Sequence, residues 1–328
     1  MLDTVKYGLG FGKCYISRVV VPFEVDPAES TPFTKGSHRT RLHTYYRSSV
    51  ATFGTLRRFN PALECVFATN ATPPKWVARQ FERLNVQIEH VDARSSQLLP
   101  AGTTFRTSLY LFDVLRAITV PNGRIVAYLD PDVLCVRSIE FELEDGQVGC
   151  LPLATGAHDS IKGTTLTQIA DISASLGHPK DSIPMHIGGE ILALTSAALP
   201  MLLKRVEEAL SYLASDCSPN FLNEEHVLTY ASDQNWCSIR SVVARIWTAP
   251  SYRDIPDDAL NIALWHLPAE KTRGILGIYW AVRLRLLDHL SDNAVRRLIG
   301  RRTGVIPTHR RTISDQIRRT SLQVIAGI

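Results

Sequence analysis

The stretch Tyr128-Leu129-Asp130-Pro131-Asp132-Val133-Leu134 is the most informative part of this sequence. It includes the end of an apolar run at 124–128 (RIVAY), which is typical of a strand covered on both faces in a mainly parallel sheet. Asp130 and Asp132 then follow the carboxyl end of that strand, where open α/β sheets bind ligands. Two carboxylates there can hold a hard divalent cation, and the cation can bind the phosphates of a nucleotide. Asp-Pro-Asp is also good turn chemistry, so a plain turn is the alternative.

Around this stretch, short β-rich runs alternate with amphipathic ones, which predicts an α/β fold with a mainly parallel sheet. We predict strands over 14–23, 63–69, 86–91 and 124–128, and helices over 48–58, 74–84 and 108–117. Beyond residue 135 we predict strands near 148–153, 190–194 and 238–243, and helices near 165–176, 199–214 and 224–231. Residues 24–40 are expected to form a long loop after the first strand, a place where such folds bind ligands.

The composition is that of a globular protein. With 328 residues, 45% of them hydrophobic and 21% charged, a disordered or fibrous chain is excluded. The net charge of +4 is unevenly distributed. Residues 271–328 contain one Lys, eleven Arg and three Asp, a net charge of +9, so residues 1–270 carry −5. Such a block often marks an interaction surface. We therefore divide the chain into a catalytic domain, 1–274, and a helical, basic C-terminal extension, 275–328.

The cysteines and the apolar runs bear on the cellular compartment. The six cysteines are scattered without a C-x-x-C pair, so we predict small buried hydrophobes rather than a zinc or redox site. No run reaches the ~18 apolar residues of a membrane span, and the first residues lack a signal-peptide core. We expect a cytoplasmic protein. The apolar stretch 275–280 beside arginines could hold it peripherally at the inner face of a membrane, or it could be a packed terminal helix. No nucleic-acid partner is expected, because no aromatic-interleaved module accompanies the charges.

YLDPDVL resembles the D-x-D segment of GT-A glycosyltransferases, in particular the family-8 type of retaining hexosyltransferases. That family continues with an asparagine–alanine–glycine segment, an aspartate–glutamine segment and a late His…Lys element. In this sequence the segments that begin at His186, Asn223 and Leu264 occupy those places in the same order. The resemblance covers roughly residues 14–274. It implies a Rossmann-like nucleotide-diphospho-sugar transferase fold.

The sequence departs from the family at several of these places. Ile187 replaces the family's asparagine, and Glu224-Glu225 replace its aspartate–glutamine pair. The helix before the D-x-D strand carries Asp113 where the family usually has a nucleotide-contacting arginine, for which Arg106 or Arg116 could substitute. These differences indicate a divergent branch.

The resemblance implies a metal site made of Asp130, Asp132 and His266. A mixed oxygen and nitrogen set favours Mn²⁺ over Mg²⁺. Lys271 could neutralise the departing diphosphate, although a solvated lysine is the alternative. The residues expected to bind the donor are Arg106, Asp113, Asp130, Gly188, Gly189 and Lys271.

Three glutamates are candidates for catalysis: Glu190, Glu224 and Glu225. One of them could stabilise an oxocarbenium-like centre, as carboxylates do in glycosyl chemistry. Gly188-Gly189 beside Glu190 would let the backbone approach a ligand. A turn before a strand, and acidic residues that favour a helix dipole, are the structural alternatives.

The predicted function is metal-dependent transfer of a sugar from a nucleotide-sugar donor, most readily a UDP-hexose, to an acceptor hydroxyl with retention. The acceptor stays open among a glycan, a lipid-linked molecule and a protein. One rival is an inverting GT-A transferase with a glutamate as general base. A second is a nonenzymatic sugar- or lipid-binding protein that keeps the fold.

Overall fold

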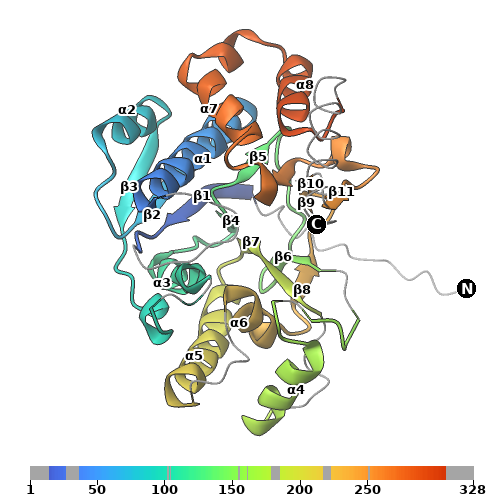
Figure 1. The fold of residues 1–328 in the computed structure, drawn as a ribbon. Helices are drawn as coiled ribbons and strands as arrows, with labels where there is room; N and C mark the ends of the chain where they lie inside the picture. Colours follow the sequence, from blue (N-terminus) through green and yellow to red (C-terminus); the bar gives the residue numbers. More distant parts are fainter. Residues whose placement is uncertain are drawn as a thin grey trace, which may run out of the picture.

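The computed structural model describes residues 15–26, 37–101, 103, 105–153, 156–160, 162–178, 185–216, 223–249 and 252–307. Within these residues the chain forms a mixed α/β fold around a seven-stranded sheet (Figure 1). The predictions for residues 27–36 of the loop, residues 308–328 of the extension, Cys14 and Cys217 lie outside the described residues.

The strands of the central sheet are β1 (Tyr15–Phe23), β2 (Glu64–Thr69), β3 (Val86–His90), β4 (Arg124–Leu129), β6 (Val148–Pro152), β7 (Ile187–Leu194) and β8 (Trp236–Ser238). Their spatial order is β3-β2-β1-β4-β7-β6-β8. The first four are parallel to one another, whereas β7 is antiparallel to both β4 and β6. The prediction of an α/β fold with a mainly parallel sheet is confirmed.

Helices cover both faces of this sheet. The α-helices are α1 (His38–Phe59), α2 (Lys75–Arg83), α3 (Tyr110–Ala117), α4 (Leu166–Ser175), α5 (Ala198–Asp216), α6 (Glu224–Ala231), α7 (Gly274–Arg283) and α8 (Asp292–Thr303). Short 3₁₀ helices are η1 (Ser95–Leu98), η2 (Arg106–Leu109), η4 (Ala259–Asn261), η5 (Pro268–Glu270) and η6 (Leu286–His289). Figure 1 shows α1, α2 and α7 on one side of the sheet, and α3, α5 and α6 on the other.

Two hydrophobic clusters follow from the alternation of side chains along each strand. Val19 and Val21 of β1 point into the cluster with α1, α2, α7 and α8, whereas Val20 points into the cluster with α3, α4, α5 and α6. In β4, Ala127 and Tyr128 divide in the same way. Because both faces of these strands are buried, their sequences read as continuous apolar runs.

A second, three-stranded sheet lies directly after the Asp130–Asp132 turn. It consists of β5 (Val133–Cys135), β12 (Leu264–His266) and β9 (Val243–Arg245), with β12 in the middle. The register places His266 opposite both Val133 and Arg245. A separate hairpin is formed by β10 (Trp247–Ala249) and β11 (Tyr252–Asp254). This small sheet therefore brings a late segment of the chain next to the end of β4.

Two predicted elements differ from the structure. Helix α1 begins at His38, ten residues before the predicted start, with the Ser37 side chain accepting the Thr40 backbone N–H. Its buried face includes hydroxyl residues such as Thr52 and Thr55, and these weaken the apolar periodicity that marks a helix. The predicted strand 238–243 is wrong, because β8 ends and β9 begins on either side of a turn.

Helix α7 packs against α1, and α8 packs against α7. A Cβ added at Gly54 of α1 would lie 2.5 Å from Val282 Cγ1, so the two helices touch closely there. Ile275, Ile278 and Val295 belong to the same hydrophobic cluster as β1. The domain boundary after residue 274 stays a prediction.

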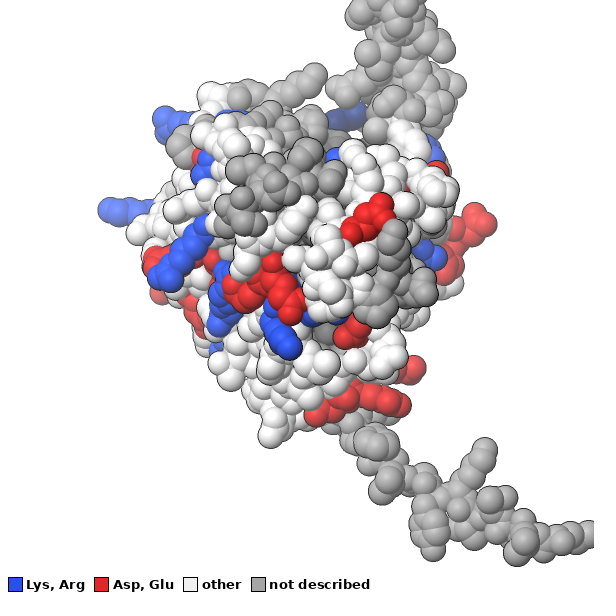
Figure 2. All heavy atoms as spheres, turned by 90° about the horizontal axis from the view of Figure 1, so that it is seen from below, with Lys and Arg blue, Asp and Glu red and all other residues white. Residues whose placement is uncertain are grey.

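No helix in the described ranges is both long enough and apolar enough to cross a bilayer. On the face seen in Figure 2, Lys and Arg side chains lie next to Asp and Glu side chains, and most of the described surface is uncharged.

Candidate active site and metal centre

A cleft of about 430 Å³ opens where β1 and β4 end. Its walls include seven of the residues predicted for the site: Asp130, Asp132, Glu190, Glu224, Glu225, His266 and Lys271. They come from the turn after β4, from β7, α6 and β12, and from the residue after η5. The sequence positions span 130–271, so the topology of the two sheets gathers them at one edge.

Local backbone bonds fix the turn that carries both aspartates. The Asp130 N–H donates to the Glu190 carbonyl of β7 at 3.0 Å, and the Val133 N–H donates back to the Asp130 carbonyl at 3.2 Å. The Thr52 hydroxyl of α1 donates to the Pro131 carbonyl at 2.8 Å. The backbone that carries the two side chains is therefore fixed by the neighbouring strand and by a helix, in addition to the bond within the turn.

Asp130, Asp132 and His266 present one ligand atom each within 4.8 Å of one another. His266 Nε2 lies 3.3 Å from Asp132 Oδ2 and 4.0 Å from Asp130 Oδ2. Adjacent ligands of an octahedral ion with bonds of about 2.1 Å are roughly 3 Å apart, so only small shifts would be needed. Asp132 Oδ1 is buried and has no hydrogen-bond partner among the described residues, which suits a cation. The three residues fit a divalent metal.

The two carboxylates have opposite electrostatic surroundings. Burial and the neighbouring Asp132 carboxylate raise the pKa of Asp130 to about 7. Burial acts against ionisation of Asp132 too, but Lys271 and His266 outweigh it and hold the pKa of Asp132 well below its usual range. Lys271 Nζ is 2.9 Å from Asp132 Oδ2. Despite its burial, His266 has a pKa raised to about 9 by the same carboxylate.

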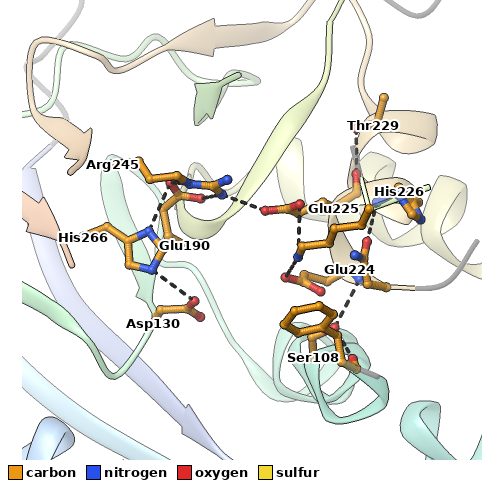
Figure 3. Close-up of polar contacts among 12 residues, drawn as sticks. Ser108, Asp130, Glu190, Glu224, Glu225, His226, Thr229, Arg245 and His266 are labelled. Carbon is orange, nitrogen blue, oxygen red and sulfur yellow. Dashed lines mark hydrogen bonds and ion pairs between the residues drawn. The ribbon is translucent and has the colours of Figure 1, made fainter. Parts of the chain in front are cut away.

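The three candidate glutamates lie beside one another with two cations (Figure 3). Arg245 of β9 donates from Nη2 to Glu190 Oε2 and to Glu225 Oε1, both at 2.6 Å. Lys162 Nζ is 3.1 Å from Glu225 Oε2 and 3.7 Å from Glu224 Oε1. Glu224 Oε2 is buried with no hydrogen-bond partner in the described part of the chain. Of the three carboxylates, Glu224 therefore has an oxygen left over for a ligand.

The charges of this cluster are set by its pairs. Burial would favour neutral carboxyls, but Arg245 holds the pKa of Glu190 and of Glu225 below the ordinary value. In the other direction, Glu224 and Glu225 raise the pKa of Lys162 against the effect of its burial. Lys162 also lies over the Phe105 ring, 4.4 Å from its centroid. Glu190 and Glu225, the two carboxylates bonded by Arg245, are therefore ionised at neutral pH.

Four residues predicted to bind the donor do not line this cleft. The Asp113 carboxylate accepts bonds from the backbone N–H groups of Arg94 and Ser95 and from Arg116, next to a different cavity. Arg106 donates to the Ser96 carbonyl at 2.7 Å and lies 3.5 Å from Asp26, which does line the cleft.

Gly188 and Gly189 make room for side chains of the site. A Cβ at Gly188 would collide with the Glu190 carboxylate, and one at Gly189 would lie 2.6 Å from Glu224 Cγ. The close approach predicted for these glycines is therefore made to the site's own carboxylates.

Two cations of the glutamate cluster, Lys162 and Arg245, were not predicted from the sequence. Arg245 had a detectable signal, because it is the single cation in the apolar run 242–247, and a buried charge needs a partner. Lys162 lies in the irregular segment between β6 and α4, where no pattern marks it.

Comparisons with known proteins give structural likenesses only. No family model matches the sequence, and no curated protein matches it. An active-site mutant of LgtC has 14% identity and a TM-score of 0.48 over 76% of this chain and 86% of its own. The apo form of the glycosyltransferase GlyE from Streptococcus pneumoniae TIGR4 has 11% identity and a TM-score of 0.47 over 86% of this chain and 62% of its own. The bifunctional glycosyltransferase WbbM, also in its apo form, has 10% identity and a TM-score of 0.46 over 81% of this chain and 46% of its own.

Proposed function

We propose that this protein is a divalent-metal-dependent glycosyltransferase of the GT-A type that uses a nucleotide-sugar donor, with a UDP-hexose as the first candidate and Mn²⁺ as the preferred metal. One observation carries the proposal: Asp130, Asp132 and His266 converge in a cleft that also contains Lys271 and a cluster of glutamates. A cation site beside a lysine suits a diphosphate, and carboxylates further along the cleft suit a sugar ring.

Each residue has a task that follows from its position. When bound, a divalent cation would supply positive charge that offsets the negative charge developing on the leaving group. Asp130, Asp132 and His266 would hold it. Lys271, held at the cleft by Asp132, would contact the leaving diphosphate.

Glu224 is our candidate for the carboxylate that acts at the reacting sugar. One of its oxygens has no hydrogen-bond partner in the described residues, and it lies close enough to raise the pKa of Asp130. Glu225 is bonded by Arg245 and Lys162, which suits a residue that orients its neighbours. In a retaining enzyme Glu224 would face the anomeric centre, and in an inverting enzyme it would take the proton of the acceptor hydroxyl.

We further infer that the protein contacts an anionic membrane surface through the start of its C-terminal extension. Trp280, Leu284 and Leu286 are all at least 43% exposed and lie within seven residues of one another, with Arg283 and Arg285 between them. Exposed apolar side chains flanked by arginines are typical of interfacial anchors. A lipid-linked acceptor would fit such a location.

The decisive experiment is calorimetric titration of the full chain with UDP, with and without Mn²⁺, followed by a test for hydrolysis of UDP-sugars. We expect UDP binding that depends on the metal, and slow metal-dependent release of free sugar. Equal UDP binding with and without the metal would contradict the proposed metal site. Metal-dependent binding without any hydrolysis or transfer would favour the nonenzymatic rival. The anomeric configuration of the released sugar distinguishes retention from inversion.

A further inference from the structure

A chain of alternating charges joins the histidine of the proposed metal site to the far end of the cleft (Figure 3). His266 Nδ1 lies 3.4 Å from Glu190 Oε1. Glu190 accepts two bonds from Arg245, at 2.8 Å from Nε and at 2.6 Å from Nη2. The same Nη2 donates to Glu225 Oε1 at 2.6 Å. Four side chains from β12, β7, β9 and α6 thus form one continuous path.

This path is buried at nearly every step. Glu190 is 1% exposed, Glu225 3% and His266 7%. Carboxylates so completely removed from water persist as ions only when they are paired and hydrogen-bonded, and Arg245 supplies both carboxylates with that partner. Gly188 leaves the space that Glu190 and Arg245 occupy. A larger residue at position 188 would therefore displace this ion pair.

Glu190 and the two aspartates lie at opposite nitrogens of the His266 ring. An imidazole binds a metal through one ring nitrogen, and a hydrogen bond at the other nitrogen selects the tautomer and the ring orientation. Glu190 Oε1 lies within ion-pair distance of Nδ1, which has no hydrogen-bond partner among the described residues, and Nε2 faces Asp130 and Asp132. A small shift of either side chain would turn the 3.4 Å contact into a hydrogen bond. Because Arg245 bonds both oxygens of Glu190, the carboxylate has no freedom to turn away.

We propose that Glu190 and Arg245 are positioning residues rather than catalytic ones. Glu190 holds His266 with Nε2 directed at the cation, and Arg245 fixes Glu190 and Glu225 with a single guanidinium group. The same guanidinium group therefore fixes one carboxylate beside the metal site and one at the sugar end of the cleft. This inference rests on the proposed metal site and assigns Glu190, a catalytic candidate by sequence, to a different task.

The test is Mn²⁺ affinity, measured by electron paramagnetic resonance on the full chain without nucleotide or turnover. Glu190→Leu removes the acceptor at Nδ1, and we expect Mn²⁺ affinity to fall by roughly 10- to 100-fold, as for other lost outer-shell partners. Glu190→Gln keeps an oxygen for the Nδ1–H and should retain most of the affinity. Arg18→Met, which breaks the pairs with Glu64 and Glu89 away from the cleft, is the matched control and should leave Mn²⁺ affinity unchanged.

A double-mutant cycle tests whether Arg245 acts through Glu190. Arg245→Met alone should weaken Mn²⁺ binding, but in the Glu190→Leu background it should cost no further affinity, because the group it holds is already gone. Additive losses would overturn the part assigned to Arg245.

The outcomes separate the two proposals. Wild-type protein that binds no Mn²⁺ would overturn the proposed function, and this inference with it. Wild-type binding together with unchanged affinity in Glu190→Leu would overturn the inference alone. If Glu190→Leu fails to unfold cooperatively, Arg245→Met decides, and wild-type affinity in that variant would overturn the inference.

Discussion

Asp130 and Asp132 are separated by one proline, yet they are not interchangeable. The Asp130 side chain is 32% exposed at the cleft, and its pKa is raised to about 7. Asp132 is buried between Lys271 and His266, and its carboxylate raises the pKa of both side chains, which keeps them protonated despite their burial. Losing Asp132 would leave two buried cations with less compensation, whereas losing Asp130 removes a partly solvated group.

The first prediction contrasts these two residues. Asp130→Asn and Asp132→Asn should both abolish Mn²⁺-dependent UDP binding in calorimetry, because each removes a proposed ligand. Asp132→Asn should also lower the free energy of unfolding by about 3–5 kcal/mol, the usual cost of breaking a buried pair, and Asp130→Asn by clearly less. Denaturant unfolding of the metal-free proteins measures this difference. UDP binding of wild-type strength and metal dependence in either variant would show that the residue is not a ligand.

The second prediction concerns the glutamates of α6. Glu224→Gln should lower kcat by on the order of 10²-fold or more while KM for the donor changes little, because the carboxylate acts in the transition state. The test is steady-state kinetics of UDP-sugar hydrolysis or transfer. Glu207→Gln, on the exposed side of α5, serves as the control and should behave as wild type. A loss of only a few fold in Glu224→Gln would exclude Glu224 as the reacting carboxylate.

At the level of elements, the sequence predicted best where the pattern is long. The parallel strands β1 to β4 and helix α6 lie where expected. Apolar runs mark β1, β2 and β4, and an acidic first turn marks α6. The three-residue strands β5, β9 and β12 carry too little pattern to predict, and the pairing of β12 with β5 joins Leu264 to Cys135, more than 100 residues away in the sequence. His266 could be proposed only through the family resemblance, and the partnership of Arg245 with two glutamates required the tertiary fold.

The third prediction concerns the segment around the end of α7. The full chain should co-sediment with anionic vesicles and less with neutral ones. Binding should fall with salt, because the Debye length shrinks to about 8 Å at 0.15 M. The double variant Leu284→Asp with Leu286→Asp should lose this binding, while Met201→Asp, an equally exposed apolar residue on α5, should not. Equal binding to both vesicle types would mean that these arginines are an ordinary solvated surface.

On the scale of the whole molecule, the two hydrophobic clusters contain three buried thiols. Cys65 and Cys135 lie in one cluster and Cys150 in the other. Burial raises the pKa of the Cys65 thiol to about 11, and the pKa values of Cys135 and Cys150 to about 12. The expectation that cysteines serve as small core residues fits these three positions.

The fourth prediction follows from those pKa values. A pH of 8 is 3 to 4 units below the pKa of each of these thiols. Only about 10⁻³ to 10⁻⁴ of each thiol is therefore present as the reactive thiolate. Reactivity of the folded protein with iodoacetamide should therefore be negligible at Cys65, Cys135 and Cys150, and should appear when the protein is unfolded in guanidinium. Mass spectrometry of the digested protein reads out each position. Fast labelling of any of the three under native conditions would contradict the described packing.

The contact between Gly54 and Val282 has a practical consequence for anyone who shortens this chain. Helix α1 has no side chain of its own at that point, so the surface left after removal of α7 would be a groove lined by the backbone of α1 and by the former neighbours of Ile275 and Ile278. The Arg58 guanidinium would lose its acceptors, the carbonyls of Leu287 and Leu290. A truncated protein ending at residue 274 should consequently aggregate on expression, whereas one ending after Pro307 keeps α7 and α8 and should stay folded. The useful cloning boundary is thus set by helix packing and not by the point at which the charge of the sequence changes.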